Sequence, residues 1–193
     1  GLFTCRPGFG EDLTKLFNLL TGYAVAQDWK HLLIAPLGMK TAFLQKIHRE
    51  IEHAREGRLA HIRAKLNAIT DLEIVDALYQ ASQAGVQVDL IIRGICVLQP
   101  ALSGWSVNIR AISIIDRNLE HARIYAFANG GEPEYRLASA DWMSRNLNRR
   151  IEVAFPILEP LLQKQIERIL QIQLADDKKA RVLLPDSTSI RRV

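Results

Sequence analysis

The run HARIYAFA, which begins at His121, places an imidazole and a guanidinium two positions apart. Side chains alternate between the two faces of a strand, so His121 and Arg123 are expected to lie side by side. An imidazole exchanges protons near neutral pH, and a guanidinium can hold two phosphate oxygens at once. The pair therefore suits phosphate chemistry, with His121 as the catalytic candidate. The alternative is a surface histidine that pairs with its neighbour Glu120.

Arg93 closes an otherwise largely apolar strand and is followed directly by Gly94. In open parallel sheets, ligands gather at the carboxyl ends of the strands, where a glycine lets the backbone approach a ligand. A buried guanidinium without a partner is costly, so Arg93 requires either an anion or a neighbouring acid. Both alternatives stay open. Lys65 and Asn67, at the end of the preceding strand, carry the same argument more weakly.

A polar cluster follows the run EYRLASA and contains Ser139, Asp141, Arg145, Asn146, Arg149 and Arg150. The order His-x-Arg, a hairpin, then Ser-x-Asp and Asn resembles half of a phospholipase D-type site, in which a small polar segment orients the histidine. The alternative is an Arg-rich loop on a solvated surface. The candidate phosphate channel therefore comprises Lys65, Asn67, Arg123, Asp141, Arg149 and Arg150. No metal site is predicted, because His48 and His53 are five positions apart and do not share a helix face.

The elements that must position these side chains can be read from the hydrophobic spacing. Strands are expected over 31–36, 61–67 and 86–93, separated by helices over 41–57 and 70–85. This order with short connections predicts a parallel βαβαβ unit with right-handed crossovers. Four strand-like runs over 107–115, 121–128, 134–140 and 151–157 then predict an antiparallel-rich second half. A closing helix over 160–175 and a short strand over 181–184 complete a mixed α/β sheet flanked by helices.

Three further details of the helices are predicted. The first helix, over 11–21, should bury one face, made by Leu13, Leu16, Phe17 and Leu20. Thr70 and Glu73 should form a capping box at the start of a helix that buries Leu72. The closing helix should turn Leu162, Ile166, Ile169 and Ile172 or Gln173 towards the core.

Composition narrows the class of protein. The 193 residues are 48% hydrophobic and 24% charged, which indicates one globular domain. The net charge of +4 allows a phosphate-rich partner, while 7% aromatic residues argue against a nucleic-acid-binding module. Cys5 and Cys96 form no CxxC, so a reduced, cytoplasmic location is expected, with a peripheral position at the inner membrane as the alternative. No apolar run is long enough for a transmembrane segment, and the opening without Met indicates a piece of a longer protein.

Several segments resemble the C-terminal half of polyphosphate kinases. They are GLFT, IHREIEHAREG, KLNAITDLEIVDALYQASQAGVQVDLIIRGIC, LEHARIYAFANGG and SADWMSRNLNRRIEVAFPI, and together they cover residues 1 to about 174. The resemblance implies a phospholipase D-like fold and a single C-terminal catalytic domain over 1–193. Within it, a leading segment and helix span 1–22, the sheet core spans 30–158, and a closing helix and tail span 159–193.

The same resemblance implies a reversible transfer of the ATP terminal phosphate to polyphosphate through a phosphohistidine in a preceding domain. Arg93 matches the family's ATP-contacting arginine, and His121 matches an ATP-contacting histidine that is not the covalent carrier. ATP or ADP, polyphosphate and the preceding domain are the implied partners, and a homo-oligomer is expected for the full-length enzyme. Mg²⁺ is the implied cofactor, with its protein ligands upstream. The fragment alone is expected to be inactive.

Two other functions compete with this interpretation. A phospholipase D-like phosphodiester hydrolase, complete as a dimer, would carry His-x-Lys with a downstream Asp. This chain has His121-x-Arg123 and no acid in the next four residues. A non-catalytic nucleic-acid or anion-binding module would show a steep salt dependence of duplex binding. The sparse aromatic residues and the modest charge argue against this binding module.

Overall fold

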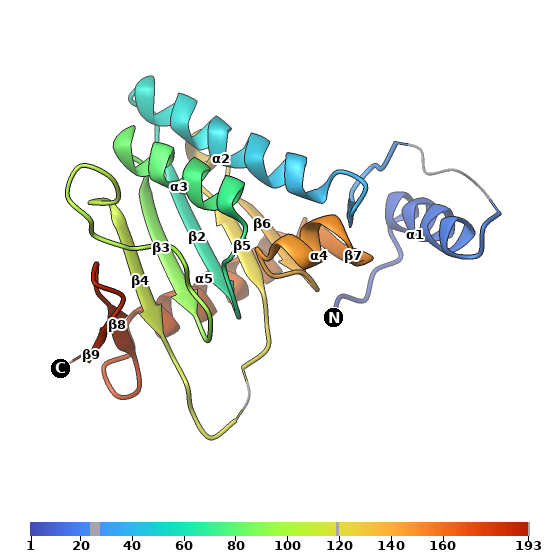
Figure 1. Cartoon of the computed structure of the whole chain (residues 1–193). Coiled ribbons are helices and arrows are strands. Elements are labelled where there is room, and N and C mark those ends of the chain that lie inside the picture. The colour runs from blue at the N-terminus through green and yellow to red at the C-terminus, as the bar shows by residue number, and fades with distance from the viewer. Residues whose placement is uncertain (24–27, 119, 193) are drawn as a thin grey trace.

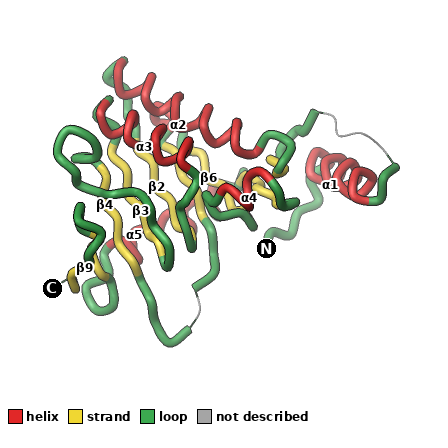
Figure 2. Tube along the Cα trace, in the orientation of Figure 1, coloured by secondary structure: helices red, strands yellow, loops and turns green. Residues whose placement is uncertain are grey.

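One mixed sheet organises the chain in the computed structural model, which describes residues 1–23, 28–118 and 120–192. Within these residues the strand order is β1-β7-β6-β5-β2-β3-β4-β8-β9, with helices on both faces (Figures 1 and 2). The strands are β1 (Leu33–Ala35), β2 (His61–Leu66), β3 (Gln87–Ile92), β4 (Ile109–Ser113), β5 (Ile124–Phe127), β6 (Glu134–Ala138), β7 (Glu152–Pro156), β8 (Arg181–Leu183) and β9 (Ser189–Arg191). The helices are α1 (Pro7–Leu20), α2 (Met39–Arg55), α3 (Leu72–Gln83), α4 (Ser144–Asn148) and α5 (Pro160–Leu174), and a 3₁₀ turn spans Asn129–Gly131.

The predicted mixed α/β sheet is confirmed, but two strand neighbours differ from the prediction. β2, β3 and β4 are parallel, so the parallel part extends beyond residue 107, where an antiparallel half was expected to begin. β1 does not lie beside β2; it forms the edge of the sheet and pairs antiparallel with β7. The sequence run of β1 has the buried character of an inner strand, but burial alone does not specify which strand it pairs with. β9, which extends the sheet beyond β8, was not predicted.

Each face of the sheet carries its own core. α2 and α3 cover one face, where Phe43, Ile47 and Leu78 are fully buried. α5 covers the other face and buries Ile166, Leu170 and Leu174 (Figure 1). β5 separates the two cores by strict alternation. Tyr125 and Phe127 belong to the first core, and Ile124 and Ala126 to the second. Because β5 is buried on both faces, packing from both cores fixes its position in the sheet. The polar residues predicted from the sequence lie at the ends of such central strands.

Two helices begin or turn differently from the predictions. The N-cap of α3 is Asp71, whose carboxylate accepts a hydrogen bond from Ile74 N, so the predicted capping box at Thr70 is wrong. Consequently Leu72 is the first helical residue and is 70% exposed. On α5 the buried stripe runs through Ile166, Leu170 and Leu174, while Ile169 and Ile172 are exposed. These shifts of one position follow from packing that local spacing does not specify.

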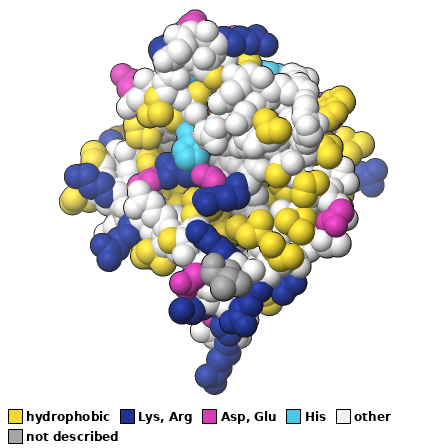
Figure 3. All heavy atoms as spheres, turned by 90° about the vertical axis from the view of Figure 1, so that its left-hand side faces the viewer, with side chains coloured by type: hydrophobic (Ala, Val, Ile, Leu, Met, Phe, Trp, Pro, Cys, Tyr) yellow, Lys and Arg dark blue, Asp and Glu magenta, His cyan; other side chains and the backbone are white. Residues whose placement is uncertain are grey.

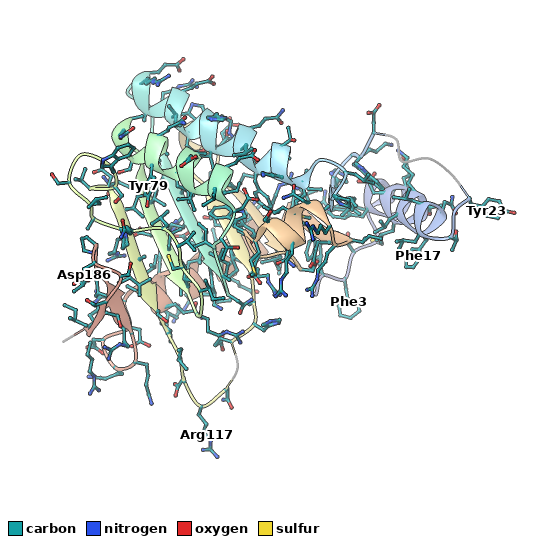
Figure 4. The ribbon with its side chains drawn as sticks, in the orientation of Figure 1. Phe3, Phe17, Tyr23, Tyr79, Arg117 and Asp186 are labelled. Carbon is teal, nitrogen blue, oxygen red and sulfur yellow. The ribbon has the colours of Figure 1, made fainter. Side chains whose placement is uncertain are left out.

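α1 lies beside the β1 edge of the sheet (Figure 1). It begins at Pro7 rather than residue 11, because proline suits the first turn of a helix. Phe9 and Leu16 pack against Leu32 and Ile34. The rest of the predicted apolar face, at Leu13, Phe17 and Leu20, is exposed, and Figure 4 shows Phe17 pointing away from the sheet. No described helix combines the length and hydropathy that a membrane crossing needs.

Candidate active site

Four segments that are distant in the sequence meet at one end of the central strands. They are the ends of β2, β3 and β6 and the start of β5. β2 and β3 are parallel, and β6 runs in the same direction because β5 lies antiparallel between β2 and β6. The carboxyl ends of β2, β3 and β6 therefore lie at the same end of the sheet, and β5 begins there. Two bridges join the continuations of these strands, from Ile69 to Cys96 and from Ile69 to Trp142. The predicted gathering of polar side chains at the carboxyl ends of strands is thus explained by strand direction.

An open cleft of about 320 Å³ lies at these carboxyl ends of β2, β3 and β6. It is lined by Asn67, Ala68, Arg93, Gly94, Ile95, His121, Arg123, Asp141, Met143, Arg145, Asn146 and Arg150. The chain after β3 approaches the end of β2 closely at Gly94, whose N donates to Asn67 O at 2.8 Å. A Cβ at position 94 would lie 3.1 Å from that same carbonyl oxygen. The glycine after Arg93 therefore allows two strand ends to close against each other.

An ion pair forms one wall of the cleft. Arg123 Nη2 donates to Asp141 Oδ2 at 3.0 Å, and Asp141 Oδ1 accepts from Asn67 N at 2.7 Å and from Asn67 Nδ2 at 3.1 Å. Burial raises the pKa of Asp141, but the hydrogen bonds from Arg123 and Asn67 outweigh it, so this pKa lies below its usual range. Asp141 is therefore a carboxylate that holds Arg123 and the end of β2 together.

The backbone around Asp141 is fixed by the core. Its neighbours Ala140 and Trp142 are both fully buried, and Tyr125 donates its hydroxyl to Ala140 O at 2.7 Å. Trp142 packs against the ring of Tyr125, with centroids 4.9 Å apart. The segment that carries Asp141 is thus anchored on one side by a hydrogen bond from Tyr125 and on the other by the aromatic packing of Trp142.

Glu152, on β7, was not predicted as part of the site. It is 9% exposed and accepts hydrogen bonds from Ser139 Oγ and, at 3.0 Å, from Asn146 Nδ2. Asn146 Oδ1 in turn accepts from Asp141 N at 3.3 Å. The available signal was an acidic residue in a strand that is otherwise apolar, because a buried carboxylate requires donors.

His121 lies just outside the strand that was predicted to contain it. β5 begins at Ile124, and His121 is an exposed residue of the preceding connection. The expected neighbour is nevertheless present, since Arg123 Nη2 lies 3.4 Å from His121 Nε2. Glu120 lies 3.8 Å from Lys65 Nζ, so its described ionic contact is with Lys65 rather than with His121.

Arg93 follows β3 and lines the cleft. Its Nη1 is buried and has no hydrogen-bond partner among the described residues. The ion-pair alternative from the sequence therefore has no acid partner within the described chain. A buried donor without a partner is costly, and an anion in the cleft would satisfy it.

Two members of the predicted phosphate channel do not line the cleft. Lys65 is 4% exposed, and its Nζ donates to Ala122 O at 3.2 Å, on the α5 side of the sheet. Arg149 is exposed but is absent from the cleft wall, whereas Arg150 belongs to it. The cleft does bring together Asn67, Arg93, His121, Arg123, Asp141 and Arg150. Proximity in sequence did not distinguish Arg149 from Arg150.

The described residues offer no place that suits Mg²⁺. No group of three or more His, Cys, Asp or Glu side chains among them is arranged to hold a metal ion. Asp141, the one carboxylate among the cleft-lining residues, is already engaged by Arg123 and Asn67. These residues do not fit a hard-cation site, which requires several free oxygen ligands.

Cationic side chains also extend beyond the cleft. Figure 3 shows Lys and Arg gathered towards the lower tip of the face that carries β8 and β9, with acidic side chains among them. Figure 4 places Arg117 at the tip of the connection between β4 and β5. On the same connection Asp116 lies 3.3 Å from Lys179, so this lysine already has an acidic partner.

Comparison with known proteins identifies the family. The profile of the family described as polyphosphate kinase C-terminal domain 2 matches residues 32–192. The chain belongs to this family. A polyphosphate kinase from Thermosynechococcus vestitus is 55% identical over 192 residues, and one from Synechocystis is 52% identical over the same length. Both matches cover the whole chain but 26% of the relative, so this polyphosphate kinase domain spans about a quarter of the length of these relatives.

Solved structures agree with the assignment to the polyphosphate kinase family. The crystal structure of polyphosphate kinase from Porphyromonas gingivalis matches with a TM-score of 0.95 and 41% identity, over 98% of this chain and 29% of that one. Nuc from Salmonella typhimurium, a phospholipase D family member, matches with a TM-score of 0.57 at 15% identity, over 79% of this chain and 96% of that one. The second likeness concerns the fold alone and confirms the predicted phospholipase D-like sheet.

Proposed function

We propose that this chain is the C-terminal catalytic domain of a polyphosphate kinase and forms half of its active site. In the complete enzyme, the terminal phosphate of ATP passes to a histidine of the preceding domain, leaving ADP. The phosphohistidine then transfers that phosphate to the end of a polyphosphate chain, which regenerates the histidine. Both steps are reversible.

The observation that carries the proposal is Arg93 Nη1, which is buried without a partner among the described residues, beside a cleft that also contains His121 and Arg123. A phosphate group placed there accepts hydrogen bonds from the two arginines, and both charges favour it. Arg123 keeps its orientation through Asp141, so the cation is positioned before the ligand arrives.

His121 acts on the same phosphate as a general acid/base or by orienting it, rather than as the covalent carrier. Its exposed position on the cleft wall leaves the ring accessible to a ligand from outside this domain. Arg123 lies 3.4 Å from its Nε2, and the described acids nearby are held by Lys65 and Arg123. No described carboxylate therefore pairs with the imidazole, whose described side-chain contact is with Arg123.

The partners of the proposed enzyme follow from the reaction. ATP or ADP, polyphosphate and the preceding catalytic domain meet at the cleft, and the full-length enzyme is a cytoplasmic or inner-membrane-associated homo-oligomer. Mg²⁺ bound with ATP would offset the charge of its phosphates, and its protein ligands would lie outside this chain. The 193-residue chain alone neither labels itself with the ATP γ-phosphate nor makes polyphosphate.

Substitution of His121 in the complete enzyme tests the proposal. We expect His121→Ala to abolish most polyphosphate synthesis without loss of fold, because an exposed side chain contributes little packing. His121→Gln separates two roles, since glutamine donates a hydrogen bond to phosphate but does not exchange protons near neutral pH. A general acid/base role predicts that Gln is nearly as poor as Ala, with a loss of roughly a hundredfold. A positioning role predicts substantial recovery.

His48→Ala is the matched control, because His48 is an exposed histidine on α2, outside the cleft. It should leave synthesis unchanged. Wild-type rates in both His121 variants would remove His121 from the active site. Acid-labile phosphate on the isolated 193-residue chain after incubation with radiolabelled ATP would show that the covalent carrier has been assigned to the wrong domain.

A further inference from the structure

Lys65 occupies an unusual position for a cation in a phosphate-binding domain. It lies near the end of β2, on the face of the strand that points towards α5, and its side chain is 6% exposed. Burial lowers the pKa of Lys65, an effect that the charge of Glu120 only partly offsets. A lysine that is costly to bury and does not line the cleft requires another role.

The contacts of Lys65 lie on both sides of His121. Its Nζ donates to the carbonyl oxygen of Ala122 at 3.2 Å and lies 3.8 Å from the carboxylate of Glu120. Residue 120 precedes the candidate histidine and residue 122 follows it. No other described lysine or arginine makes a hydrogen bond or ion pair to either neighbour.

The segment held in this way has little support of its own. Residues 115–118 and 120–122 are exposed and belong to no helix or strand. Figure 1 shows the connection between β4 and β5 extending beyond the ends of the sheet. Lys65, by contrast, projects from a central strand paired with both β3 and β5. The ammonium therefore links an exposed connection to a central strand of the sheet.

We propose that Lys65 is a positioning residue. From the α5 face of the sheet, it fixes the backbone on both sides of His121. The proposal rests on the function proposed for His121, and it replaces the phosphate-channel role expected from the sequence. Loss of the ammonium would free the carbonyl of Ala122 and the carboxylate of Glu120. The imidazole would then be held only through its contact with Arg123.

The test uses the complete enzyme with Lys65→Met, which keeps the length of the side chain and removes the charge. Hydrogen exchange is measured by mass spectrometry on peptides that cover residues 120–124, together with kcat and KM for ATP. We expect faster exchange in this segment and a fall in kcat of about tenfold or more, the effect of losing a charge-assisted hydrogen bond. KM for ATP should change by less than about threefold, because Lys65 does not touch the ligand.

Two further variants keep the test decisive. Lys65→Arg retains the charge and should restore part of both properties. Glu120→Gln removes the charge of the second partner of Lys65. Because the side chain of Glu120 is 52% exposed, this variant should fold normally, and it should give a smaller change in exchange and kcat. Lys164→Met is the control: Lys164 is an exposed lysine on α5, outside the cleft, and should alter neither readout.

Exchange and kcat at wild-type values in Lys65→Met would overturn the proposal. A raised KM for ATP with unchanged exchange would also overturn it and return Lys65 to direct phosphate binding. The exchange measurement requires no activity. Faster exchange in an enzyme whose His121→Ala variant is fully active would therefore confirm the tether and refute the proposed function of His121.

Discussion

Arg123 and Asp141 form an ion pair of 3.0 Å with side chains only 14% and 7% exposed, although 18 positions separate them in the sequence. The pair connects the start of β5 with the end of β6. It also sets the guanidinium 3.4 Å from His121 Nε2. A side-chain contact between two neighbouring segments thus brings a cation to the candidate histidine.

Asp141→Asn should remove the charge of this pair while keeping most of its shape. The buried guanidinium of Arg123 then lacks a counter-charge, so we expect a loss of about 3 kcal/mol in stability and a fall in kcat of about tenfold or more. Asp177→Asn, in an exposed pair with Lys178, should change neither property. Thermal unfolding and steady-state kinetics of the complete enzyme measure both effects. A fully active Asp141→Asn enzyme would contradict the positioning of Arg123 by Asp141.

Arg93→Lys tests the planar grip of a guanidinium on phosphate. An ammonium on a shorter side chain cannot reproduce the fork, so kcat/KM should fall about tenfold or more, equivalent to about 1.5–3 kcal/mol. Arg55→Lys, at the exposed end of α2, is the matched control and should have no effect. Equal kinetics in the two variants would remove Arg93 from the site.

Gly94→Ala should disturb the cleft without changing any charge. The new Cβ would lie 3.1 Å from Asn67 O, so the ends of β2 and β3 must move apart by a few tenths of an ångström. Because Arg93 and Asn67 sit at these ends, we expect a loss of activity of about tenfold, with a small loss of stability. Gly10→Ala, inside α1 with open space around it, should leave activity unchanged. Activity at the wild-type level would show that the strand ends tolerate the shift.

Glu134→Gln should reveal a carboxylate that stabilises the fold far from the cleft. Burial alone would raise the pKa of Glu134, but Lys46 and Arg136 outweigh it and bring the pKa to about 2. A depressed pKa stabilises the fold above the unfolded value of 4.5, and the effect is lost as the pH falls towards about 2. The variant should thus lose about 2 kcal/mol near pH 7, with a difference that shrinks below pH 4.5.

The exposed Glu132 provides the control for this measurement, because Glu132→Gln should show no such pH dependence. Thermal unfolding at several pH values between 3 and 7 distinguishes the two variants. A difference between Glu134→Gln and the wild type that stays constant over this range would argue against the depressed pKa.

Much of the local structure was determined by the sequence alone. The alternation in 61–67 predicts that Arg63 and Lys65 leave the face of Ile62 and Ala64, and β2 shows this division between the two cores. The sequence also predicted the polar character of the strand ends and the neighbouring positions of His121 and Arg123, and it contained the segments that resemble the family. The backbone geometry of a strand or helix imposes such patterns within a few residues, so they can be read without the fold.

The tertiary structure decided which of these residues meet. It paired β1 with β7, joined Arg123 to Asp141, added Glu152 behind the cleft and turned Lys65 away from it. Lys65 and Asn67 occupy the same face of one strand pattern, yet only Asn67 lines the cleft. Periodicity gives the face on which a side chain stands but not the distant segment that covers it. That choice depends on the order of strands in the sheet and on the packing of α5, where residues far apart in sequence come into contact.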